Sequence, residues 1–202
     1  MDPVVLYNFT LLNLKKMKVL VIGASGAIGK IITPLLAGKH EIITAGRNSG
    51  DIRVDISSAA SIENMFKTTA NVDACICTAG DSYAGELFSM TEEKLNLGIK
   101  NKLLGQANLV CIGQHYLNDN GSFTLTSGKM GDKPAKNAAG KAIANGGINS
   151  FVLAASLEMP RGIRVNVVSP ARISDIPAND LAEGYKRSIE GTANGELIKI
   201  NY

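Results

Sequence analysis

The chain has 202 residues, of which 45% are hydrophobic and 19% charged, and its formal net charge is +3 at pH 7. This length allows one sizeable core and is short for two ordinary domains. The basic residues are scattered rather than gathered into a run that could follow a phosphate backbone, which argues against nucleic acid binding. No stretch reaches the roughly 18 to 20 apolar residues that cross a bilayer, so we expect no membrane segment.

Residues 1–16 precede the first regular pattern of the sequence. Asp2 and Pro3 stand where a secretory signal would be basic, and Lys15 and Lys16 follow the apolar part. We therefore expect residues 1–16 to be an N-terminal extension and residues 17–202 to form the domain.

The sequence contains three cysteines, an odd number. Cys75 and Cys77 alternate within the hydrophobic run "VDACICTAG", a spacing that suits a buried strand rather than a metal knuckle or a disulfide framework. The number and spacing of the cysteines predict no metal site and favour a reducing, cytoplasmic setting.

From Lys18 onward, short apolar runs alternate with stretches of helical periodicity. The predicted strands are 18–23, 41–46, a short one within 51–56, 72–80, 121–128, 162–170 and 196–201. The predicted helices are 27–38, 57–69, one or two within 91–117, 141–159 and 178–190. A turn is expected at "LNDNGS". The alternation predicts a single-domain α/β fold, a Rossmann-like doubly wound parallel sheet with helices on both faces.

The stretch "VIGASGAIGK" places Gly23, Gly26 and Gly29 directly after the first predicted strand and at the start of a helix. Glycines in this position let the backbone approach a pyrophosphate, and the amides of the helix start offer positive partial charge to it. The pattern therefore favours dinucleotide binding over a tight turn that binds nothing.

Arg47 follows the second predicted strand, where the adenine ribose of a dinucleotide would lie. An acidic residue at this point favours a free 2′-hydroxyl, and an arginine accommodates a 2′-phosphate. No acidic residue occupies the strand end, since Asp51 comes only after Gly50. NADP(H) is therefore favoured over NAD(H), the alternative being that Arg47 is an ordinary solvated charge.

Several segments resemble the short-chain dehydrogenase/reductase family, over roughly residues 17–175. "IGASGAIG" is similar to the family's TGxxxGxG turn, although Ile22 replaces Thr and Ala27 replaces Gly. "VDI" resembles the segment whose acidic residue, here Asp55, lies beside the adenine, and "CTAG" is similar to the family's NNAG. The most specific match is "GIRVNVVSPA" (162–171), which resembles the strand and loop that carry the nicotinamide.

The resemblance implies a nicotinamide dinucleotide held by the glycine turn, by the ends of strands and by the loop after the sixth strand. The residues that it and the turn assign to the cofactor are Gly23, Ser25, Gly26, Ala27, Ile28, Gly29, Arg47, Asn48, Asp55, Ile56, Thr78, Ala79, Gly80, Pro170, Ala171 and Ile173. "LTSG" places Ser127 like the family's catalytic serine, and Asn101 resembles the asparagine that holds a water in the proton relay.

The family's YxxxK motif is missing from this sequence. Counting back from Glu158 puts its tyrosine at Lys141 and its lysine at Asn145; a second register puts the tyrosine at Asn137 and the lysine at Lys141. Both registers lose the residue that would protonate the alkoxide left by hydride transfer. Lys141 is the candidate replacement, because the reference pKa of lysine, about 10.4, is close to that of tyrosine. A water and a displaced Tyr83 are the alternatives.

Two functions fit these residues. The first is an NADP(H)-dependent oxidoreductase acting on a small carbonyl or alcohol substrate, with Ser127 orienting the carbonyl, Asn101 supporting a water relay and Lys141 as proton source. The second is a non-catalytic NADP-binding sensor or interaction protein on the same fold. Pro177 follows Pro170 after six intervening residues, so any segment covering the substrate is expected to be short.

The predicted helix 141–159 is rich in small residues, among them the adjacent Gly146 and Gly147. Glycine in a helix interior costs about 1 kcal/mol relative to alanine, so close packing is expected, either on the sheet or on another subunit. The family resemblance implies a homodimer or homotetramer that forms through helices at about 98–117 and 141–159.

Overall fold

Seven parallel strands form one sheet in the order β3-β2-β1-β4-β5-β6-β7 in the computed structural model, which describes residues 16–69 and 71–202. The strands are β1 (Lys18–Ile22), β2 (Glu41–Gly46), β3 (Ile52–Arg53), β4 (Val72–Cys77), β5 (Leu117–Thr126), β6 (Arg164–Pro170) and β7 (Leu197–Ile200). The order reverses direction between β1 and β4, as expected of a doubly wound sheet. The prediction of the fold class is confirmed, and the proposed extension lies outside the described residues, Lys16 excepted.

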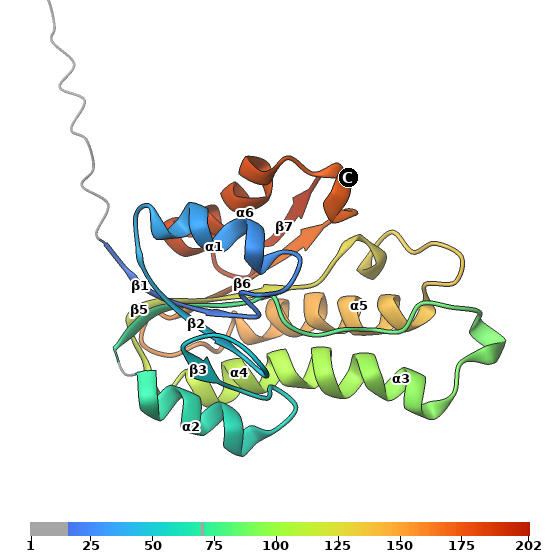
Figure 1. Cartoon of the computed structure of the whole chain (residues 1–202), viewed down its shortest axis with the longest axis horizontal. Coiled ribbons are helices and arrows are strands. Elements are labelled where there is room, and N and C mark those ends of the chain that lie inside the picture. The colour runs from blue at the N-terminus through green and yellow to red at the C-terminus, as the bar shows by residue number, and fades with distance from the viewer. Residues whose placement is uncertain (1–15, 70) are drawn as a thin grey trace, which may run out of the picture.

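Helices cover both faces of the sheet (Figure 1). They are α1 (Gly29–Ala37), α2 (Ala59–Thr69), α3 (Glu92–Gly98), the π-helical η2 (Ile99–Leu104), α4 (Gly105–Gly113), α5 (Ala139–Ala155) and α6 (Ala178–Glu190), with short 3₁₀ turns η1 (Leu87–Ser89), η3 (Lys129–Gly131) and η4 (Ile173–Asp175). α1 and α6 pack on one face, and α2, α4 and α5 on the other. None of these helices is long and apolar enough to cross a membrane.

Strand β1 shows why the apolar run "KVLVI" forms a strand buried on both sides. Leu20 and Ile22 belong to the core under α2, α4 and α5, whereas Val19 and Val21 belong to the core under α1 and α6. Successive side chains of a strand point to opposite faces, so a strand covered on both faces reads as a continuous hydrophobic run. Cys75 and Cys77 are buried in β4, as their spacing predicted.

Some predicted boundaries were wrong. The turn expected at "LNDNGS" is part of β5, which starts irregularly, with Asn120 at φ 60° and a shift of register between Val72 and Ala74 of the neighbouring strand. Asparagine tolerates this left-handed conformation, so the turn-like composition reflects a distorted strand start. The predicted helix 141–159 runs from Ala139 to Ala155.

The two adjacent glycines of α5 serve packing within the chain. A Cβ on Gly147 would lie 2.7 Å from a methyl carbon of Leu103 in η2, and one on Gly146 would lie 3.3 Å from the carbonyl oxygen of Gly131 in η3. A side chain at either position would require Leu103 or the backbone of η3 to shift. The small residues therefore bring α5 close to the carboxyl end of β5.

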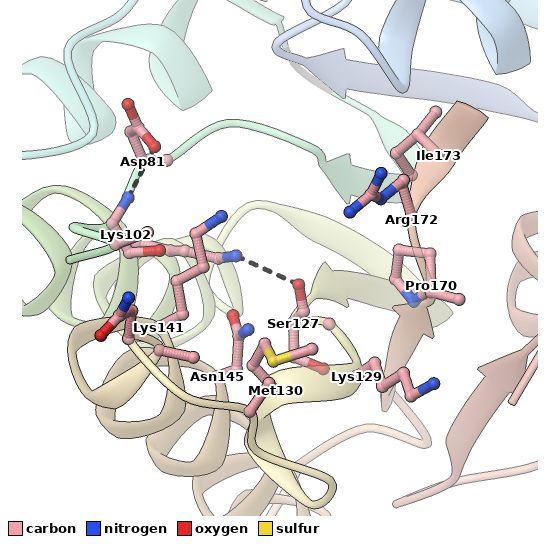
Figure 2. A pocket seen from close by; sticks show the side chains of 18 of the residues that line it. Asp81, Lys102, Ser127, Lys129, Met130, Lys141, Asn145, Pro170, Arg172 and Ile173 are labelled. Atoms are coloured by element: carbon pink, nitrogen blue, oxygen red, sulfur yellow. Dashed lines mark hydrogen bonds between the residues drawn. The ribbon is translucent and has the colours of Figure 1, made fainter. Parts of the chain in front are cut away.

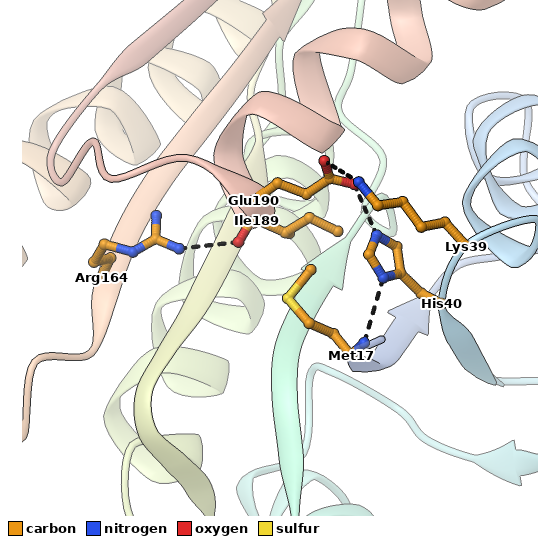
Figure 3. A network of polar contacts seen from close by, with 6 residues as sticks. All are labelled: Met17, Lys39, His40, Arg164, Ile189 and Glu190. Atoms are coloured by element: carbon orange, nitrogen blue, oxygen red, sulfur yellow. Dashed lines mark hydrogen bonds and ion pairs between the residues drawn. The ribbon is translucent and has the colours of Figure 1, made fainter. Parts of the chain in front are cut away.

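A polar network closes the opposite, amino-terminal edge of the sheet (Figure 3). Glu190 of α6 accepts hydrogen bonds from Lys39 Nζ at 2.7 Å and His40 Nε2 at 2.9 Å, and the backbone nitrogen of Met17 donates to His40 Nδ1 at 3.4 Å. Arg164 donates to the carbonyl oxygen of Ile189 at 3.1 Å. The network ties the end of α6 to the turn before β2 and to the start of β1.

Replacing Glu190 by glutamine should destabilise the fold and change its pH dependence. Burial opposes the shift, but hydrogen bonds from Lys39 and His40 outweigh it and lower the pKa of Glu190. A carboxylate with a lowered pKa contributes stability above its unfolded pKa and loses it as pH falls through the folded value. We expect E190Q to lower the free energy of unfolding at pH 7 by about 1 kcal/mol, a Tm decrease of roughly 2–4 °C.

Thermal unfolding of E190Q and E183Q between pH 3 and 7 measures this effect, since Glu183 is an exposed carboxylate of the same helix. The difference between the two variants should shrink toward acid pH. Equal stability of the two variants at pH 7 would refute the role given to the network.

Candidate active site

The glycine turn after β1 is packed against the end of β4. Gly23 has a φ of +87°, and a Cβ on it would lie 2.8 Å from the backbone nitrogen of Ala79. A Cβ on Gly29 would lie 2.2 Å from the carbonyl oxygen of Gly23. The hydroxyl of Thr78 donates to the carbonyl oxygens of Ile22 and Gly23, both at 3.1 Å. The turn thus requires glycine at both positions, and it leaves the start of α1 open.

A cleft of about 840 Å³ lies between this turn and the ends of β2 and β4. Of the residues predicted to bind cofactor, those that line it are Gly23, Ser25, Gly26, Ala27, Ile28, Arg47, Asn48, Ile56, Thr78, Ala79, Gly80 and Ile173. Gly29 and Asp55 do not line it. Residues that the sequence reasoning missed also line it, among them Ser49, Asp81 and Leu97. The donor-rich turn and the elongated cleft fit a dinucleotide.

Arg47 lies at the far end of this cleft and is held by Asp55. Its guanidinium contacts Asp55 Oδ1 at 3.1 Å, and both side chains are partly exposed. Asp51 is directed elsewhere, because its carboxylate accepts hydrogen bonds from the backbone nitrogen and the hydroxyl of Thr44 at 2.9 and 2.8 Å. Among the described residues, Asp81 is the only acidic one that lines the cleft, and Arg47 is its lining residue at the end of β2.

A second pocket, of about 620 Å³, continues from the first through shared lining residues that include Ile28, Gly80 and Ile173. Ser127, Lys141, Pro170, Ala171 and Ile173, all predicted site residues, line it. Asn101 does not; it lines the nucleotide cleft instead. Only residues 171–177 separate β6 from α6, as the short loop in the sequence predicted. The two spaces form one continuous depression along the carboxyl ends of the strands.

Ser127 directly follows β5 and is 4% exposed, with its backbone nitrogen donating to Val168 at 3.0 Å. Its hydroxyl oxygen has no hydrogen-bond partner among the described residues. Gln106 of α4 fixes the strand end, accepting from the backbone nitrogen of Thr126 at 2.8 Å and donating to its carbonyl at 3.0 Å. A buried hydroxyl without a partner is unfavourable, so Ser127 is poised to bind a ligand.

Two lysines from different helices reach the space beside Ser127 (Figure 2). Lys102 of η2 donates from Nζ to the carbonyl oxygen of Ser127 at 3.1 Å. Burial lowers the pKa of Lys102 to about 8, and the positive charge of Lys141 on α5 acts in the same direction. A pKa of about 8 lets Lys102 give a proton to a developing alkoxide near neutral pH.

Sequence reasoning did not identify Lys102. It could have been found from helical spacing, because Lys102 precedes Gln106 and Leu109 by four and seven residues, and both of these are fully buried. A lysine on the buried stripe of a helix is rare unless it has a partner or a function. Asn145, also in the pocket lining, has a buried side-chain oxygen without a partner.

No tyrosine that the structure describes is among the residues that line this pocket. Tyr185 is fully buried beneath β5, where its hydroxyl lies 2.8 Å from Thr126 Oγ1 and burial raises its pKa. The ring of Tyr83 packs under the ammonium of Lys94 at 4.9 Å. Tyr7 lies outside the described residues. Tyr83 does not line the pocket itself, but its hydroxyl lies against Gly85, which does.

A family model described as enoyl-(acyl carrier protein) reductase matches residues 24–198. Together with the fold and the site, this match shows that the chain belongs to the short-chain dehydrogenase/reductase family of oxidoreductases. No curated protein matched in a separate search.

Solved structures of this family resemble the chain along its length. The protein lin1944 from Listeria innocua is 40% identical, with a TM-score of 0.88 over 92% of this chain and 100% of that one. A small-chain dehydrogenase solved in complex with NADPH is 26% identical, with a TM-score of 0.83 over 93% and 97% of the two chains. A further small-chain dehydrogenase is 28% identical, with a TM-score of 0.80 over 92% and 97%.

Proposed function

We propose that this protein is an NADPH-dependent reductase of small carbonyl compounds that uses lysine in place of the family's tyrosine. The observation that carries the proposal is the unpartnered, buried hydroxyl of Ser127 beside the ammonium groups of Lys102 and Lys141, where the nucleotide cleft opens into the second pocket. The similar small-chain dehydrogenase solved in complex with NADPH supports a nicotinamide dinucleotide as the cofactor.

Arg47 supports NADPH over NADH. A guanidinium offers paired N–H donors and a permanent positive charge, which match a ribose 2′-phosphate. Asp55 contacts the guanidinium of Arg47 at 3.1 Å without lining the cleft, and so it orients the arginine.

The chemistry assigns one task to each side chain around Ser127. NADPH, when bound, supplies the hydride. The Ser127 hydroxyl donates a hydrogen bond to the substrate carbonyl oxygen and so orients it. As negative charge develops on this oxygen, one of the ammonium groups of Lys102 and Lys141 transfers a proton to it, giving the alcohol and a neutral amine that is reprotonated from solvent. Because Asn101 lines the nucleotide cleft, the relay is assigned to the lysines instead of to Asn101.

The second candidate is a sensor or interaction protein that binds NADP without hydride transfer. The observation that favours it is the lack of a described tyrosine in the lining of the pocket. The two candidates predict the same nucleotide affinity and differ only in turnover.

Arg47→Ala should weaken NADPH binding by about 10- to 100-fold, because it removes a charge-assisted contact to the 2′-phosphate, and should change NADH binding by less than about threefold. Isothermal titration calorimetry with both nucleotides measures this. Arg53→Ala is the matched control, since Arg53 is an exposed arginine that does not line the cleft. Equal NADPH affinities of the two variants would overturn the assignment of Arg47.

Ser127→Ala should lower kcat for carbonyl reduction by about 100-fold, because it removes the donor that orients the substrate, while leaving NADPH affinity unchanged.

The rate of the unmodified protein should fall as pH rises through about 8, where Lys102 loses its proton. Lys141, Asp81 and Cys77 face Lys102 from the neighbouring elements; Cys77 stays neutral, since burial raises its pKa to about 12.

NADPH oxidation with a panel of aldehydes, ketones and oxo acids measures this prediction. Ser150→Ala is the control, since Ser150 is exposed on α5 outside the pocket. Inertness toward the whole panel, with NADPH demonstrably bound, would reject the reductase in favour of the sensor.

We also propose that the protein self-associates. Leu104 of η2 and Ile143 and Leu153 of α5 expose 49%, 44% and 57% of their surface, on the helices that were predicted to form the subunit interface. Apolar side chains of this size on neighbouring helices mark a surface that gains free energy when it is covered. A second copy of the chain would cover them in a homodimer or homotetramer.

The double substitution of Ile143 and Leu153 by glutamate should convert the oligomer to monomer, because two carboxylates would have to be buried in the interface. Sedimentation velocity at micromolar concentration measures the mass. Leu35→Glu, on α1 across the sheet, is the control. An unchanged mass in the double variant would place the interface elsewhere.

A further inference from the structure

The pocket beside Ser127 carries a marked excess of positive charge. The cationic residues in its lining are Lys102, Lys129, Lys136, Lys141 and Arg172. Asp81 is the only carboxylate in that lining, and it accepts a hydrogen bond from the backbone nitrogen of Ser82 at 2.7 Å. Within residues 16–69 and 71–202, none of the five cations forms an ion pair with a carboxylate.

Lys102 and Lys141 are the two cationic residues beside Ser127. Their side chains reach the same space from η2 and α5 (Figure 2), and the positive charge of Lys141 contributes to lowering the pKa of Lys102. An ammonium group has three donors, and Lys102 directs one of them to the carbonyl of Ser127. Two partly buried like charges repel each other, and an anion between them removes the repulsion and satisfies the remaining donors.

The phosphates of a dinucleotide are not suited to be this anion. The amides at the start of α1, near Gly26 and Ile28, line the nucleotide cleft and provide the site for a pyrophosphate. Arg47, which follows β2, lines that cleft as well. Lys102 and Lys141 do not line it at all, so their charges are available to the substrate.

We propose that the pocket selects a 2-oxo carboxylate, with Ser127 on the carbonyl oxygen, Lys141 on the carboxylate and Lys102 as the proton donor. This inference rests on the proposed function and deepens it by naming the substrate class. A carboxylate next to the carbonyl is favoured because Lys102 contacts the backbone of Ser127 itself, so the cationic site begins at the residue that orients the carbonyl. The products are the 2-hydroxy carboxylate and the oxidised nucleotide.

The first experiment compares NADPH oxidation with 2-oxobutanoate and with its methyl ester. The acid should have a kcat/KM at least tenfold higher, and Lys141→Gln should remove most of this preference while Lys141→Arg retains it. Lys100→Gln is the matched control, because Lys100 is an exposed lysine of η2 that lines neither space. An ester used as well as the acid overturns the proposal.

The second experiment measures binding without turnover. Calorimetric titration of the NADP⁺ complex with oxalate should show affinity that falls at least tenfold in Lys141→Gln and stays unchanged in Lys100→Gln. Loss of oxalate binding in Lys141→Gln, with no reduction of any oxo acid, would support the anion site and reject the reductase. Equal oxalate binding in both variants, or inorganic phosphate bound in preference to oxalate, overturns the proposed carboxylate site.

Discussion

The contact between the glycine turn and the end of β4 is the constraint on which the rest of the site depends. Gly23 can adopt its φ of +87° and lie against Ala79 only because it has no Cβ, and the Thr78 hydroxyl holds the turn by two hydrogen bonds. This contact sets the start of α1 beside the loop that continues through Gly80 to Asp81. Those two residues line both spaces, so the two spaces meet at this loop.

Much of this arrangement could be predicted from the sequence because its signals are local. Strand β2 has the predicted bounds 41–46, and α6 likewise matches its predicted range 178–190, because apolar runs and helical spacing are read from neighbouring residues. The glycine spacing indicated a tight turn that only residues without a Cβ can form, so the role of Gly23 in the turn could be predicted from the sequence. The packing of Gly147 on Leu103 could not, because the sequence allowed a partner subunit equally well.

The part of the site that sequence reasoning missed depends on a departure from regular helix geometry. Residues Ile99–Leu104 are wound as a π-helix between two α-helical segments, and π-helical turns often mark functional positions. An i→i+5 turn displaces the side chains from the faces that α-helical spacing predicts. Here Asn101, expected beside Ser127, lines the nucleotide cleft, whereas Lys102 reaches the carbonyl of Ser127. Helical spacing places Lys102 on a buried stripe with Gln106 and Leu109, but it does not indicate the contact with the carbonyl of Ser127.

The loss of the tyrosine and the charge of the pocket have one physical origin. A phenol is neutral before it donates its proton, so a pocket built around it can accept neutral substrates. An ammonium group is charged before it donates, and burial makes it a stronger acid, as it does for Lys102. Two such groups in one pocket repel each other until an anion lies between them. In the proposed mechanism, lysine in place of tyrosine changes the substrate together with the proton donor, because a carboxylate on the substrate would compensate the charge that the new donor introduces.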